Sequence, residues 1–260
     1  MRAELEEMAE VWRKSPVSEI PPEELMVVTD FDGTLAEIGP DPAKSAALPG
    51  ALDALERLSR VLKEVVVLSS RTLTDLERLV PLSGIRLVGD SGLPPPTPNE
   101  KRALDLFNAE ATRLLGSVPG VWIEKKPAST TVHLRKAQIA GEEALSMLRP
   151  VIKATGLFGG QGRKVIEVHT RFGGKGTALA GLLDEVEPGG VICMGDDEND
   201  RAAFEVLSAH HIPHLTIGVS SPEVPPDLFK RCDVVFNSPN QAVAFLQMLA
   251  EWAEAGVPSR

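Results

Sequence analysis

The stretch from Val27 to Ile38 constrains this chain most, because an apolar run there ends on two carboxylates one residue apart. Val27 and Val28 predict a buried strand, so Asp30 falls at the carboxyl end of that strand, where open α/β sheets bind ligands. Asp30 and Asp32 project to the same side of an extended segment, and carboxylates this close repel unless a cation or a shared proton relieves them. For this pair alone, a strand ending in an Asx-type turn is the structural alternative.

A second acidic strand end lies far downstream, where the apolar run 191–194 leads into Gly195 and a group of acids. The carboxyl ends of parallel strands share one edge of a sheet, so the two acidic turns are expected to meet around one cation. Carboxylate oxygens suit Mg²⁺, which keeps several waters and binds through a few carboxylates plus substrate phosphate. The candidate metal ligands are Asp30, Asp32, Asp196, Asp197 and Asp200.

Charge and composition exclude several classes of partner. The net charge is −10 and the pI about 5.1, so no basic field attracts nucleic acid or an anionic membrane. No apolar run approaches the ~20 residues that span a bilayer, and the first eight residues are acidic and helix-forming rather than signal-like. The only cysteines, Cys193 and Cys232, provide no disulfide framework. We expect a cytoplasmic monomer without nucleic-acid or membrane partners.

Strand and helix patterns alternate along most of the chain. Apolar runs at 65–68, 85–88, 191–194, 215–219 and 234–236 are predicted strands, and apolar residues at helical spacing precede or follow most of them. This order predicts an α/β fold with a doubly wound parallel sheet covered by helices on both faces.

The alternation is interrupted at the proline-rich segment 94–98, a stiff connector. Predicted strands at 120–126, 130–135 and 164–169, with helices at 100–115 and 142–147, form a smaller α+β insert. We therefore expect a core domain at residues 1–93 and 172–260 and an inserted domain at residues 94–171.

With the two acidic motifs, residues 30–35 (Asp-Phe-Asp-Gly-Thr-Leu) and 195–200 (Gly-Asp-Asp-Glu-Asn-Asp), the chain resembles the haloacid-dehalogenase-type phosphatases. Ser69 after a second strand and Lys175 before the last motif complete that pattern. The resemblance implies a Rossmann-like core that uses Mg²⁺, with Asp30 as nucleophile and Asp32 as general acid and base. It further implies that Ser69 and Lys175 bind phosphate and that Asp196 is a metal ligand beside Asp30.

The insert carries Glu124-x-Lys126, His133-x-Arg135 and the run 161–167, which ends at Glu167. With Lys175-Gly176, these resemble the trehalose-6-phosphate phosphatases over about residues 27–249. The resemblance implies a cap domain in which Glu124, Lys126 and Glu167 hold sugar hydroxyls. The other substrate-binding positions that it implies are Ser70, Arg71, His133, Arg135 and Asn199.

Five residues depart from that family's pattern: Ser70 stands for a Gly, Ser91 for a His, Pro94 for a Glu, Asn199 for a Thr and Arg201 for a Glu. The expected function is hydrolysis of a small sugar phosphate, trehalose 6-phosphate, to trehalose and phosphate through an aspartyl-phosphate. Glucosylglycerate, glucosylglycerol and sucrose phosphates remain alternative substrates, and a catalytically weak sugar-phosphate-binding module is the alternative function.

Overall fold

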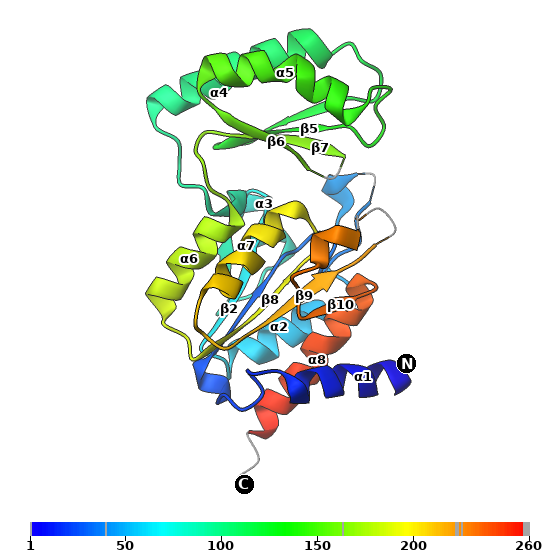
Figure 1. Cartoon of the computed structure of the whole chain (residues 1–260), viewed down its shortest axis with the longest axis vertical. Coiled ribbons are helices and arrows are strands. Elements are labelled where there is room, and N and C mark those ends of the chain that lie inside the picture. Colours follow the sequence, from blue (N-terminus) through cyan, green and yellow to red (C-terminus); the bar gives the residue numbers. More distant parts are fainter. Residues whose placement is uncertain (1, 40, 163, 222–223, 225, 257–260) are drawn as a thin grey trace. The chain divides into compact units, whose positions relative to one another are not determined.

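The structure is a computed structural model that describes residues 2–39, 41–162, 164–221, 224 and 226–256. Arg163, in the run 161–167, lies outside the described residues, as do residue 1 and residues 257–260 of the expected core domain. The chain divides into two compact units, a core unit built from the chain up to Ser91 and from Lys175 onward, and an inserted unit, Gly92–Gly174. Each unit has its own sheet (Figure 1).

The core unit is built on a six-stranded sheet in the order β10-β9-β8-β1-β2-β3, in which all paired strands are parallel. Its strands are β1 (Leu25–Thr29), β2 (Glu64–Leu68), β3 (Arg86–Val88), β8 (Gly190–Gly195), β9 (His214–Val219) and β10 (Val234–Phe236). All five residues of β1 are buried, as expected for a central strand with helices on both faces.

Alternate residues of β1 belong to two separate apolar cores, one on each face of the sheet. Leu25 and Val27 pack with α1 (Arg2–Lys14), α2 (Ala51–Ser59), α3 (Leu73–Leu79) and α8 (Pro239–Ala255). Met26 and Val28 pack with α6 (Lys175–Val186) and α7 (Glu198–Ala209). Figure 1 shows α6 and α7 on one side of the sheet and α2 and α8 on the other. The expected doubly wound α/β fold is therefore confirmed.

The inserted unit has an antiparallel sheet in the order β4-β5-β7-β6, covered on one face by two helices. Its elements are α4 (Pro98–Leu115), β4 (Trp122–Lys125), β5 (Ser129–His133), α5 (Gly141–Thr155), β6 (Phe158–Gly162) and β7 (Val165–His169). Val132, Ile166 and Val168 pack against the helices. Because side chains alternate across a strand, their neighbours in sequence project from the opposite face.

Strand β6 is absent from the sequence-based prediction, which places three strands in the insert. Its sequence, Phe-Gly-Gly-Gln-Gly, lacks the β-branched and alternating residues that signal a strand, and most of it is exposed. Five residue pairs with β7 hold it in the sheet, so pairing rather than propensity creates this strand.

The N-terminal helix α1 belongs to the core unit. Met8 and Trp12 are buried, and the Trp12 ring lies 4.6 Å from Trp252 and 6.4 Å from Phe245, both on α8. Short 3-10 turns occur at Pro22–Glu24, Pro42–Lys44, Asp90–Gly92 and Pro226–Phe229. Among the described residues, no helix is both long and apolar enough to cross a bilayer.

Replacing Trp12 with alanine should remove this packing and leave a cavity between α1 and α8. We expect the free energy of unfolding of the core unit to fall by roughly 3–5 kcal/mol, measured by urea denaturation with far-ultraviolet circular dichroism. Leu73→Ala is the control, because Leu73 is 45% exposed. This substitution should change the free energy of unfolding by less than about 0.5 kcal/mol. Equal effects of the two substitutions would contradict the assignment of α1 to the core.

Candidate active site

The two acidic strand ends lie side by side in the middle of the core sheet. Strands β1 and β8 pair in parallel with Thr29 opposite Met194, and the backbone N–H of Asp30 donates to the Met194 carbonyl at 2.9 Å. Each strand ends one residue before an aspartate, Asp30 after β1 and Asp196 after β8. The sheet register therefore brings residues 166 positions apart in sequence to the same edge.

Three buried carboxylates gather at this edge. Asp30, Asp196 and Asp200 each offer an oxygen within 4.8 Å of the others, and all three residues are buried. Lys175 Nζ lies 2.7 Å from Asp30 Oδ1 and 2.7 Å from Asp200 Oδ1, and this lysine is only 3% exposed. The cluster thus holds one ammonium group among three carboxyl groups.

The cluster carries more potential negative charge than Lys175 can balance. Burial raises the pKa of the Asp30 carboxyl to about 7, although the charge of Lys175 acts in the opposite direction. Burial also lowers the pKa of Lys175, but Asp200 and Asp30 outweigh it, so the net shift is upward. An all-oxygen donor set with excess negative charge fits a hard divalent cation such as Mg²⁺. Asp30, Asp196 and Asp200 are the residues that could hold it.

Backbone constraints fix these carboxylates. Asp200 Oδ2 accepts hydrogen bonds from the backbone N–H groups of Asp196 and Asp197, both at 3.0 Å. Gly33 has a left-handed φ of 80°, and a Cβ atom there would lie 2.0 Å from Asp196 Oδ2. A side chain at position 33 would therefore displace a carboxylate of the cluster.

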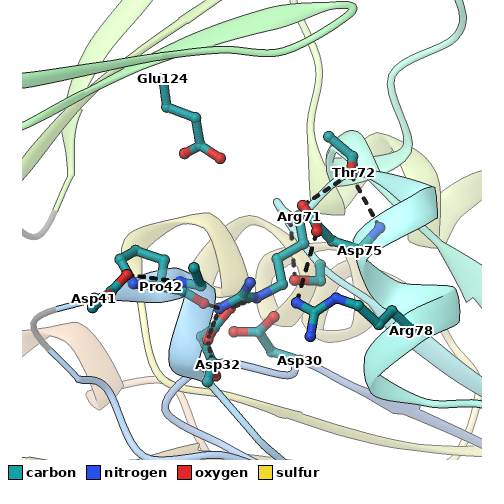
Figure 2. A network of polar contacts seen from close by, with 12 residues as sticks. Asp30, Asp32, Asp41, Pro42, Arg71, Thr72, Asp75, Arg78 and Glu124 are labelled. Atoms are coloured by element: carbon teal, nitrogen blue, oxygen red, sulfur yellow. Dashed lines mark hydrogen bonds and ion pairs between the residues drawn. The ribbon is translucent and has the colours of Figure 1, made fainter.

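The three-carboxylate cluster does not include the other two predicted metal ligands, Asp197 and Asp32. Asp197 is the N-cap of α7, and its carboxylate accepts the backbone N–H of Glu198 at 2.7 Å. Both oxygens of Asp32 accept from Arg71, at 2.6 Å from Nε and 2.8 Å from Nη2 (Figure 2). Both are thus engaged in other contacts.

Asp32 is held by two segments besides its own. Arg71 Nη2 also donates to the Pro42 carbonyl at 3.0 Å, and Ser45 Oγ donates to Asp32 Oδ1 at 3.0 Å. The buried Ser69 Oγ accepts the backbone N–H of Arg71 at 3.3 Å. Ser45 is not among the residues predicted from the sequence, because a serine in a loop gives no signal of the carboxylate it contacts.

The remaining predicted positions of the core unit lie beside this edge. Ser70 follows β2, and Asn199 lies in the first turn of α7, both partly buried. Ser91 is 2% exposed, has a left-handed φ of 55° and donates its backbone N–H to the Ser69 carbonyl at 2.8 Å. Arg201 forms ion pairs with Glu198 and Glu205 of its own helix.

In the inserted unit, predicted sugar-binding residues share the sheet face opposite α4 and α5. Glu124 pairs with Thr131, and Thr131 pairs with Glu167, so the three form one row across the strands. Glu124 Oε2 lies 2.9 Å from His133 Nε2 and 3.7 Å from Lys126 Nζ. Arg135 follows β5 and is partly buried. This unit therefore presents a row of charged and hydrogen-bonding groups.

A six-stranded parallel core with a carboxylate cluster at its edge and an inserted antiparallel unit defines the haloacid-dehalogenase-like class of capped proteins. Residues 28–228 match the model of the trehalose-phosphatase family. The trehalose-phosphate phosphatase of Mycobacterium tuberculosis H37Rv is 35% identical over 210 residues, which cover 72% of this chain and 52% of that protein. The chain therefore belongs to the trehalose-phosphatase family.

Solved structures show the same fold at lower sequence identity. The C-terminal domain of Candida albicans trehalose-6-phosphate phosphatase aligns with a TM-score of 0.72 at 20% identity, over 95% of this chain and 96% of that one. A trehalose-6-phosphate phosphatase related protein aligns at 0.68 and 23% identity, over 87% and 97%. The chain spans about half the length of the curated relatives it matches.

Substituting Gly33 with alanine should weaken cation binding, because the new Cβ displaces the Asp196 carboxylate. MgCl₂ should raise the melting temperature of the wild-type chain, and Gly33→Ala should lose most of that rise. Gly156→Ala is the matched control, since Gly156 also has a left-handed φ, of 69°, but a Cβ atom there would meet no other atom within 4 Å. A Gly33→Ala chain that Mg²⁺ stabilises as much as the wild type would exclude this cluster as the metal site.

Proposed function

We propose that this chain is a magnesium-dependent phosphomonoesterase that acts on a sugar phosphate, and that its substrate is trehalose 6-phosphate. The observation that carries the proposal is the buried cluster in which Lys175 lies 2.7 Å from both Asp30 and Asp200, with Asp196 alongside. A lysine and a cation site around one aspartate place positive charge where a phosphoryl group develops negative charge.

Asp30 is the proposed nucleophile. Its carboxylate oxygen forms a bond to phosphorus while the bond from phosphorus to the sugar oxygen breaks, which leaves an aspartyl-phosphate. Lys175 contacts Asp30 Oδ1 and so orients this carboxylate and favours its ionised form. Uncatalysed hydrolysis of phosphate monoesters is among the slowest known reactions, so positioned charge must supply most of a barrier reduction of roughly 20 kcal/mol.

Asp32 is the proposed general acid and base. It protonates the departing sugar oxygen, then takes a proton from the water that attacks phosphorus and releases phosphate from Asp30. Arg71 and Ser45 hold both oxygens of Asp32 in the absence of substrate. The sugar oxygen must therefore replace one of these contacts during the reaction.

Ser69 and Lys175 are proposed to bind the phosphoryl oxygens, and Ser70, Arg71 and Asn199 to contact the substrate nearby. Bound Mg²⁺, held by Asp30, Asp196 and Asp200, would neutralise charge on the phosphoryl group. Asp32 and Asp197 would act beside that site, since they are outside the group of three and their carboxylates contact Arg71 and the N-terminus of α7.

Two observations support trehalose 6-phosphate as the proposed substrate. The chain belongs to the trehalose-phosphatase family, and the inserted unit has a polar sheet face suited to binding hydroxyl groups. Glu124, Lys126 and Glu167 would accept and donate charge-assisted hydrogen bonds to the sugar, with His133 and Arg135 nearby. In this proposal the core unit carries the chemistry and residues 94–171 form the cap that selects the sugar.

Replacing Asp30 with asparagine should reduce phosphate release from trehalose 6-phosphate by roughly 10⁴-fold or more, because the amide is nearly isosteric but not nucleophilic. Asp105→Asn, at an exposed position of α4, is the control and should keep full activity. Turnover by a preparation of Asp30→Asn verified free of deamidation would exclude this nucleophile. Binding without turnover in the wild type would instead identify a sugar-phosphate-binding module.

Lys126→Ala should lower kcat/KM for trehalose 6-phosphate. The expected loss of transition-state stabilisation is about 1–3 kcal/mol, the usual loss for a hydrogen bond to a charged group. Hydrolysis of p-nitrophenyl phosphate, which lacks a sugar, should change little. Lys125→Ala is the matched control, since Lys125 is the adjacent lysine and is exposed. Equal losses on both substrates would show that Lys126 acts through folding or chemistry.

A further inference from the structure

Trp122 differs from the two other tryptophans of the chain in its surroundings. Trp12 and Trp252 pack against each other in the core unit. Trp122 lies on β4 with 49% of its surface exposed. A single exposed aromatic residue is common on protein surfaces, so exposure alone implies no function.

One face of the Trp122 ring is covered by a residue of the polar sheet face. Its ring stacks on His133 with centroids 4.3 Å apart and planes inclined by 20°. His133 in turn contacts Glu124, with 2.9 Å between Nε2 and Oε2. Because His133 fixes the ring on one side, the indole is oriented as a flat platform beside Glu124.

This combination of groups suits a pyranose ring. A pyranose carries hydroxyl groups around its rim and a patch of C–H groups on its face. The π-face of an indole attracts C–H groups, and carboxylates accept hydrogen bonds from the rim. The same strand face offers both, since Trp122 and Glu124 are two residues apart on β4.

The sheet register sets the distance from this platform to Glu167. Trp122 and Glu167 are separated by two strand spacings and by an offset of two residues, because Trp122 pairs with His133 and Glu167 pairs with Thr131. Standard strand spacing and rise place their Cα atoms roughly 12 Å apart. A hexose stacked on Trp122 would lie beside Glu124, and a second sugar ring would extend the ligand along the sheet face toward Glu167.

We propose that Trp122, oriented by His133, is a specificity-determining residue that stacks on one pyranose ring and favours two-ring sugar phosphates over hexose monophosphates. This proposal rests on the proposed function for its substrate. It adds a stacking contact to the hydrogen-bonding positions at Glu124, Lys126 and Glu167.

The kinetic test compares Trp122→Leu with Trp122→Phe in the full chain. Trp122→Leu should lower kcat/KM for trehalose 6-phosphate by about five- to tenfold, mainly through KM, and Trp122→Phe should restore most of it. Glucose 6-phosphate and p-nitrophenyl phosphate should change less than about twofold. Phe158→Leu is the matched control, the same change of ring to aliphatic chain at a 44% exposed residue of β6. Equal losses on all three substrates would overturn the proposal.

A binding test separates this proposal from the proposed function, because it needs no turnover. Trehalose, the neutral disaccharide, should change the intrinsic tryptophan fluorescence of the wild-type chain, and glucose should change it much less. The signal should vanish in Trp122→Leu and persist in Phe158→Leu. No response to trehalose, an unchanged response in Trp122→Leu, or an equal response to glucose would each overturn the proposal, whatever the phosphatase assay shows.

Discussion

The contact between Lys175 and two buried carboxylates is the interaction on which the candidate site depends. A buried ammonium group is costly unless paired, and Asp30 and Asp200 pair it at 2.7 Å each. Asp30 follows β1, Lys175 opens α6 and Asp200 lies in the first turn of α7. One lysine thus joins three elements at the carboxyl edge of the sheet, and the cluster it forms still has excess negative charge for a cation.

The two units contribute different kinds of polar surface. The core unit offers buried, fixed charge, in which even backbone N–H groups are used to hold Asp200. The inserted unit offers a sheet face on which Glu124 contacts both His133 and Lys126, and the side chains of Glu124 and His133 remain partly accessible. Charge fixed in a buried site suits phosphoryl transfer, whereas a broad polar face suits a ligand with many hydroxyl groups.

Much of the core could be predicted from the sequence, because its strands are continuous apolar runs that end on conspicuous acids. The pairing of the two acidic strand ends follows from the rule that parallel strands share one carboxyl edge. Strand β6 could not be predicted, since its glycines carry no strand signal and pairing with β7 creates it. The roles of Ser45 and Trp122 could not be predicted either. Ser45 contacts Asp32 and Trp122 stacks on His133 only because separate segments of the chain meet in the fold.

By itself, the sequence determined the α/β class, the presence of an insert and the acidic residues at two strand ends, because hydrophobic period and residue type are local properties. Only the tertiary structure decided which of the five aspartates share a cluster. Asp30, Asp196 and Asp200 form one cluster, in which Lys175 contacts Asp30 and Asp200, while Asp197 caps α7 and Asp32 pairs with Arg71. Spacing along the chain cannot distinguish these outcomes, since each depends on a partner brought close by the register of the sheet and the start of a helix.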